Sequence, residues 1–82
     1  MSKKAEVMHS DVVINGHHFE YQSEHDWYQC RGEVYYDEEH DEIPEPSLWR
    51  AAKVLVKKLE TDGYIAEANH SEKGWVEVQI KN

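Results

Sequence analysis

The chain has 82 residues and carries seventeen acidic against nine basic side chains, a formal charge of −8 with histidine neutral. This length predicts one domain with a small core, since a domain of about 60 residues buries only about 60% of its unfolded surface. It argues against an enzyme with a deep, closed cleft. The charge argues against a nucleic-acid binder that depends on overall positive charge. No apolar run exceeds three residues, so neither a membrane span nor a signal peptide is expected.

The first local signal after a patternless stretch is a hairpin. Residues 1–10 show no clear period and are expected to form a loose tail or a frayed edge before a single domain, residues 11–82. Asn15-Gly16 separates two short apolar segments and suits the positive φ angles of a two-residue turn. The pairing that this turn sets gives one face four apolar side chains: Val12, Ile14, Phe19 and Tyr21.

A third strand is predicted over residues 27–36, where apolar and polar residues alternate. Its core-facing side chains are expected to be Tyr28, Cys30, Val34 and Tyr36. Its opposite face is expected to hold Trp27, Gln29, Arg31, Glu33 and Tyr35. Residues 37–46 follow as an acidic connector, because two prolines there interrupt both helix and strand.

A helix is predicted at about residues 47–61, with Ser47 or Glu45 as its cap and Gly63 as its terminator. Two further strands are expected at 64–69 and 75–81, joined by a turn. The order β-β-β-α-β-β predicts an α+β domain in which a mainly antiparallel, curled sheet carries one amphipathic helix on one face. The helix stripe that should face the sheet consists of Leu48, Ala52, Leu55 and Leu59, flanked by Ala51 and Val56.

One helix cannot cover five strands, because five strands span roughly 20 Å and a helix is about 10–12 Å wide. The uncovered sheet face is therefore either curled inward or in contact with a partner. Aromatic and arginine side chains are typical anchors of interfaces, which makes Trp27, Tyr35, Trp75 and Arg31 candidate partner-binding residues.

The negative charge lies in the first part of the chain, where residues 1–46 hold twelve acidic and three basic residues. The connector concentrates it in Asp37, Glu38, Glu39, Asp41 and Glu42, together with Glu45. These carboxylates either solubilise the chain or dock a basic partner. We expect a small, acidic, non-enzymatic interaction or adaptor protein that binds a protein partner through the acidic connector, the aromatic face or both. A homodimer through the open sheet or an edge strand is an alternative form of the same hypothesis.

Two other functions stay open. Residues 58–65, followed by a turn and by residues 75–78, locally resemble the last helix and wing of a winged-helix DNA binder, with Arg50, Lys53 and Lys57 toward the groove. That fold needs two helices upstream, where this chain has strands, so nucleic acid is not expected as a partner. A small-ligand or metal-binding module in the curled sheet is the other alternative.

No constellation for chemistry is found. The six histidines lack the spacing of known metal motifs, so no metal site and no cofactor are expected. The pairs of acidic residues around His25 and around His40 suit only weak surface binding of a divalent ion or a titration role. Cys30 has no partner for an internal disulfide and is expected to be buried and inert, as in a cytoplasmic protein. No catalytic residue is assigned.

Overall fold

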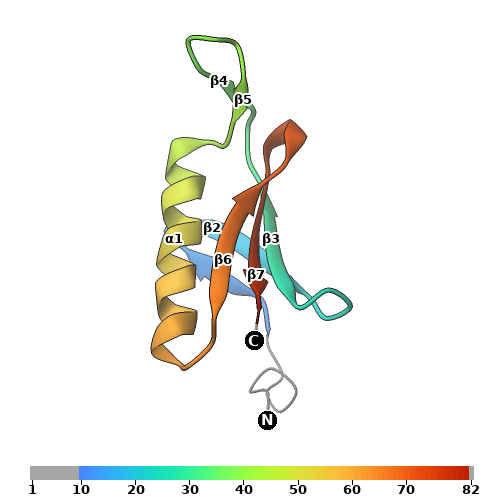
Figure 1. Cartoon of the computed structure of the whole chain (residues 1–82), viewed down its shortest axis with the longest axis vertical. Coiled ribbons are helices and arrows are strands. Elements are labelled where there is room, and N and C mark those ends of the chain that lie inside the picture. The colour runs from blue at the N-terminus through green and yellow to red at the C-terminus, as the bar shows by residue number, and fades with distance from the viewer. Residues whose placement is uncertain (1–9, 82) are drawn as a thin grey trace.

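The computed structural model describes residues 10–81, apart from the side chain of Glu72. The predicted tail, residues 1–10, lies outside the described residues except for Ser10. The described elements are β1 (Val12–Ile14), β2 (His17–Gln22), β3 (Trp27–Arg31), β4 (Tyr35–Tyr36), β5 (Glu42–Ile43), α1 (Pro46–Thr61), β6 (Ala66–His70), the 3-10 turn η2 (Glu72–Gly74) and β7 (Trp75–Ile80) (Figure 1).

Five strands form one antiparallel sheet in the order β1-β2-β3-β7-β6, and α1 packs against one of its faces (Figure 1). The predicted α+β arrangement is confirmed. Both β3 and β6 are antiparallel to β7, so they run in the same direction with β7 between them. The two outer strands of the sheet are therefore β1, which has three residues, and β6, which has five.

The first hairpin has the predicted register. Val12 lies opposite Phe19 and Ile14 opposite His17, across a turn in which Asn15 and Gly16 have φ angles of 50° and 83°. Both turn residues therefore occupy the left-handed region that a two-residue hairpin of this twist requires.

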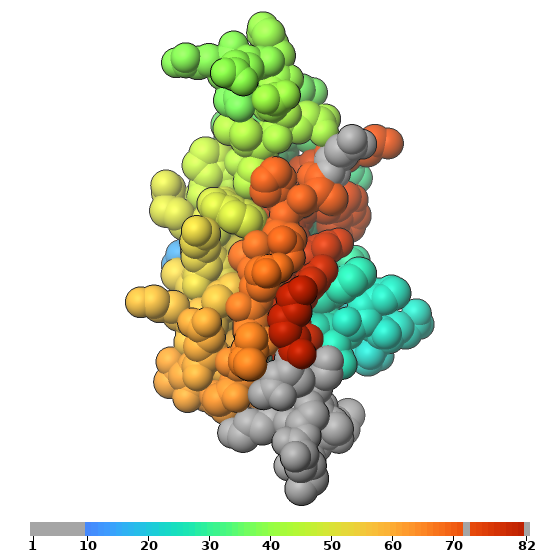
Figure 2. All heavy atoms as spheres, in the orientation of Figure 1, coloured from blue at the N-terminus to red at the C-terminus, as the bar shows by residue number. Residues whose placement is uncertain are grey.

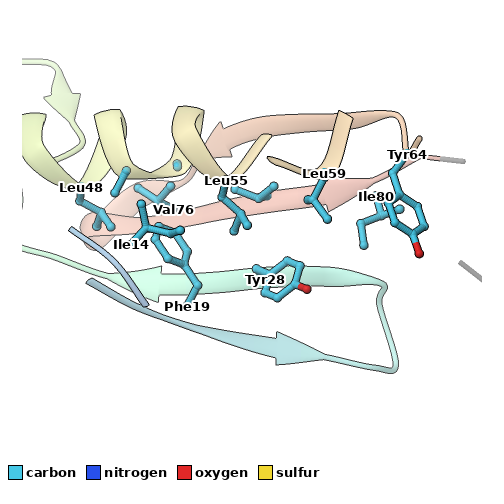
Figure 3. Close-up of a cluster of buried hydrophobic side chains, with 12 residues drawn as sticks. Ile14, Phe19, Tyr28, Leu48, Leu55, Leu59, Tyr64, Val76 and Ile80 are labelled. Atoms are coloured by element: carbon cyan, nitrogen blue, oxygen red, sulfur yellow. The ribbon is translucent and has the colours of Figure 1, made fainter. Parts of the chain in front are cut away.

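The core lies between α1 and the inner sheet face (Figure 3). The predicted helix stripe is confirmed, since the buried residues of α1 are Leu48, Ala51, Ala52, Leu55 and Leu59. They meet Ile14, Phe19, Tyr28, Tyr64, Val76, Val78 and Ile80 from the strands and the segment before β6. Alternation explains the sheet contribution, because every second residue of β7 is buried.

Both ends of α1 follow from local sequence. Pro46 occupies the first turn after the cap residue Glu45, which is the second of the two predicted caps. At the other end Gly63 has φ 94°, its N–H donates to the Glu60 carbonyl, and the Tyr64 N–H donates to the Leu59 carbonyl. This pair of bonds is a Schellman ending. No helix within residues 10–81 is long and apolar enough to cross a bilayer.

The predicted third strand, residues 27–36, is longer than the observed strand β3, which ends at Arg31. The ladder between β3 and β7 stops at Arg31 opposite Trp75, and the last bond runs from the Gly32 N–H to the Gly74 carbonyl, at 2.9 Å. Gly74 has φ 82°, and a Cβ at this residue would collide with the Gly32 carbonyl oxygen. The partner strand β7 begins only at Trp75, so the alternating sequence beyond Gly32 has no residue of β7 opposite it.

The segment after Gly32 instead forms its own hairpin, which projects from one end of the molecule (Figure 1). Tyr35 pairs with Ile43 and Tyr36 with Glu42. The predicted acidic connector, residues 37–46, is therefore the turn and second strand of the hairpin, followed by the start of α1. Consequently Tyr35 does not lie on the sheet face that holds Trp27, and Val34 and Tyr36 do not extend β3.

Candidate functional site

The predicted aromatic face does not form one patch. Trp27 lies opposite Gln79 and Arg31 lies opposite Trp75 in the ladder of β3 and β7, so the two tryptophans are four residues apart along the sheet. That separation is about 13 Å at the rise of an antiparallel strand. Trp27 stacks on His25 with ring centroids 4.3 Å apart.

Arg31 and Trp75 form a local contact at the other end of the outer face. The guanidinium carbon of Arg31 lies 5.8 Å from the Trp75 ring centroid. Its Nε donates to the Lys73 carbonyl at 3.2 Å, so this arginine also holds the turn before β7. Whether these residues bind a partner stays a prediction.

The acidic residues are held by a built turn. The Asp37 carboxylate accepts the backbone N–H groups of Glu39 at 2.9 Å and Asp41 at 3.0 Å, and His40 supplies a positive φ of 66°. The Asp37 carboxylate therefore stabilises the turn that it begins. The carboxylates of Glu38, Glu39, Asp41 and Glu42 are on exposed residues of the projecting hairpin, and their proposed role in docking stays untested.

The basic residues of the nucleic-acid alternative, Arg50, Lys53 and Lys57, are exposed on α1. Within the described range, strands and no α-helix precede α1, so the upstream helices of a winged-helix arrangement are not present there. Lys53 and Lys57 instead border a groove between α1 and β6.

A chain of polar contacts joins β2 to the start of α1 but is not arranged for catalysis. The Ser47 hydroxyl donates to the Glu45 carboxylate at 3.1 Å. Because a carboxylate only accepts, the single O–H of Ser47 is used in this bond. The Nε2 of His17 therefore donates to the Ser47 oxygen, 3.0 Å away. A nucleophilic serine needs the opposite order, in which the histidine accepts the hydroxyl proton. This chain of bonds therefore fastens β2 to α1.

Cys30 borders a hollow of about 370 Å³ where β2 separates from β3, beside Arg31 and Trp75. The residue is half-buried, and burial, with smaller contributions from the carboxylates of Glu45 and Glu20, raises the pKa of its thiol. A raised pKa leaves less of the reactive thiolate. Among residues 10–81 no group of three or more histidine, cysteine or acidic residues is arranged to hold a metal ion.

The outer edge of β6 presents backbone groups that no strand within residues 10–81 pairs with. Two backbone hydrogen bonds lie just beyond the strand ends: the Lys81 N–H donates to the Ile65 carbonyl, and the Ser71 N–H donates to the Trp75 carbonyl. Residues 65/81 and 71/75 are therefore hydrogen-bonded pairs. Hydrogen-bonded and non-bonded pairs alternate along an antiparallel ladder. Glu67 and Asn69 therefore point their N–H and C=O groups toward β7.

The remaining residues of β6 point these groups away from β7. They are Ala66, Ala68 and His70, and no strand in the described part of the chain pairs with that side. Natural sheets shield such edges with proline, charged side chains (lysine above all), bulges or very short strands. The β6 sequence contains neither proline nor lysine, and its one acidic residue, Glu67, is not among the residues whose backbone groups point outward. Its edge is therefore a template on which a further strand can pair.

A groove of about 510 Å³ lies directly beside this edge, between α1 and β6. We call it the edge groove; its lining includes Trp49, Lys53, Val56, Lys57, Ala66 and Ala68. Figure 2 views this side of the molecule, with the helix in yellow and β6 in orange. Successive side chains of a strand point to opposite faces of the sheet. Glu67 and Asn69 belong to the outer face, so the side chains of Ala66 and Ala68 face α1, and their small size leaves room for the groove.

Trp49 forms the end of the edge groove. Its ring meets His70 edge to face with centroids 5.5 Å apart, and the Lys53 ammonium lies 5.5 Å from the Trp49 centroid. Trp49 and His70 also border a second hollow, of about 280 Å³, with Ile43 and Pro44. The two hollows thus meet at Trp49 and follow the edge of β6 toward the β4–β5 hairpin.

Sequence reasoning assigned no role to Trp49, Ala66 or Ala68. The groove depends on β7 pairing between β3 and β6, which places β6 at an edge. The local sequence signal for it was a strand with two alanines and neither proline nor lysine, following a helix rich in basic residues. Comparison with protein families, curated proteins and solved structures finds no match to this chain.

Proposed function

We propose that this chain is a non-enzymatic protein-interaction module that binds an extended segment of a partner as an additional strand along β6. The observation that carries the proposal is the open backbone edge of Ala66, Ala68 and His70 beside an apolar groove. In strand addition the main chain supplies affinity and side-chain pockets supply specificity. A cytosolic location belongs to the same proposal and is supported by the single, unpaired Cys30.

The edge of β1 is a poorer template. It has three residues, and Val13, whose side chain is exposed, is the residue that points its backbone groups outward, since Ile14 and His17 close the two-residue turn. A hollow of about 310 Å³ beside α1 touches β1 at Val12 alone, whereas the edge groove runs along three residues of β6, from Ala66 to Ala68. These differences favour β6 as the binding edge.

Edge prolines provide the test. Ala68→Pro removes an N–H that points away from β7, so it blocks strand addition without breaking the β6–β7 ladder. Val13→Pro does the same at β1 and is the matched control. A random peptide library displayed on phage is selected on the wild-type protein, and each recovered peptide is then measured against both variants. We expect the peptides to bind the wild type and Val13→Pro alike and to lose about tenfold or more in affinity for Ala68→Pro.

Three results contradict the proposal. One is a library that yields no binder, and another is a set of peptides that bind Ala68→Pro as tightly as the wild type. The third is a set of peptides that lose affinity for Val13→Pro and not for Ala68→Pro, which would move the binding edge to β1. Circular dichroism of both variants shows beforehand that each is folded.

A further inference from the structure

We infer that the segment received by β6 is acidic at the alternate positions that face α1, where Lys53 and Lys57 meet it; this inference rests on the proposed strand addition. The helix wall of the edge groove is basic in an acidic protein. Of the charged residues in α1, four are basic and one, Glu60, is acidic. Among the described residues that line the groove, one other is acidic: Glu67, which belongs to the opposite sheet face and whose carboxylate lies 3.7 Å from the Lys81 ammonium.

The two lysines are level with the two alanines of the edge. The contact of Trp49 with His70 aligns α1 and β6 at one end, and the short link through residues 62–65 makes them run in opposite directions. Four residues of helix advance about 6 Å and two residues of strand advance about 6.8 Å. Lys53 therefore lies level with Ala68, and Lys57 lies level with Ala66.

A paired strand would place one side chain toward α1 opposite each of these alanines. A glutamate at either position can lay its methylene groups along Val56 and the alanine and direct its carboxylate to the lysine ammonium. The same glutamate on the other phase of the strand would face Glu67. Charge thus selects both the acidic side chain and the phase in which the segment binds.

The same wall disfavours a second copy of this chain as the occupant. The two-fold register in which all three outward-pointing residues of β6 pair with each other is centred on Ala68. That register brings the two Lys53 side chains together across the axis, with both Lys57 side chains on the same seam. Like charges at an interface oppose association, so we expect the free protein to be monomeric.

Three synthetic peptides test the inference, in which threonine alternates with glutamate, with glutamine or with lysine. Their binding to the full chain is followed by the amide NMR shifts of β6. We expect the glutamate peptide to bind about tenfold more tightly than the glutamine peptide. Lys53→Glu/Lys57→Glu should reverse the order, so that the lysine peptide binds best. Arg50→Glu/Lys58→Glu changes the charge of α1 equally, away from the groove lining, and should keep the glutamate peptide first.

Each failure has a different meaning. Equal affinity of the glutamate and glutamine peptides overturns the acidic selectivity and leaves strand addition standing. The acidic selectivity is also overturned if both double variants change the order of peptide affinities in the same way, because the effect is then one of net charge. Absence of binding at β6 by all three peptides overturns strand addition itself. A wild-type dimer in sedimentation that Ala68→Pro converts to a monomer would replace the acidic segment by a second copy.

Discussion

Two adjacent proline substitutions in β6 should differ sharply in their effect on stability. The Asn69 N–H donates into the ladder with β7, whereas the Ala68 N–H points away from it. Asn69→Pro removes one ladder bond, worth about 0.5–1.5 kcal/mol net, and leaves the facing Glu77 carbonyl without its donor, at about 1–3 kcal/mol. We therefore expect Asn69→Pro to lower the free energy of unfolding by about 2–4 kcal/mol. Ala68→Pro should change it by less than about 1 kcal/mol.

Urea denaturation followed by tryptophan fluorescence measures the difference. With a denaturant slope of about 2 kcal/mol per molar, Asn69→Pro should shift the midpoint down by about 1–2 M and Ala68→Pro by less than about 0.5 M. Asn69→Ala reports the part due to the side chain, which donates to the Glu67 carboxylate at 3.1 Å. Equal losses for the two prolines, or a larger loss for Ala68→Pro, would refute the assigned direction of the backbone groups.

Three further outcomes are expected. Gly74→Ala should lower the free energy of unfolding by about 2 kcal/mol or more, for two reasons: the new Cβ would collide with the Gly32 carbonyl, and alanine is strained at a φ of 82°. Gly16→Ala, with φ 83° and open space, should cost only the strain, about 1 kcal/mol; equal losses in urea denaturation contradict the collision.

Burial, together with a hydrogen bond to a carboxylate, raises the pKa of Tyr21 to about 12. A pKa raised in the folded state gives stability that is present below about pH 10 and lost as pH rises toward 12, so Tyr21→Phe should lose less over that window; parallel stability curves would refute this. The Cys30 thiol, whose pKa is raised by burial, should react with iodoacetamide about tenfold more slowly at pH 8 than in the urea-unfolded chain, and equal rates would contradict its burial.

Features that depend on neighbouring residues were predictable from the sequence. The turn at Asn15-Gly16 sets the register of β1 and β2 because both residues accept a positive φ. The end of α1 was predictable in the same way, since Gly63 takes the left-handed conformation that completes the helix ending. Helical spacing likewise identified the buried stripe of α1.

Features that depend on distant segments were not predictable. Alternation continues through Tyr35, yet β3 ends at Arg31 because its partner β7 begins at Trp75. No local pattern around residue 35 records where another strand starts. The edge groove has the same origin: Trp49 and Ala68 become neighbours of an open edge only because β7 pairs between β3 and β6.

Amide hydrogen exchange along β6 tests the central claim most directly, with and without the peptide of alternating glutamate and threonine. In the free protein we expect fast exchange at Ala66, Ala68 and His70 and slow exchange at Glu67 and Asn69. With the peptide bound, all five amides should exchange slowly. Slow exchange at Ala68 in the free protein, or fast exchange there in the presence of a peptide that shifts β6, would contradict an open edge that receives a partner strand.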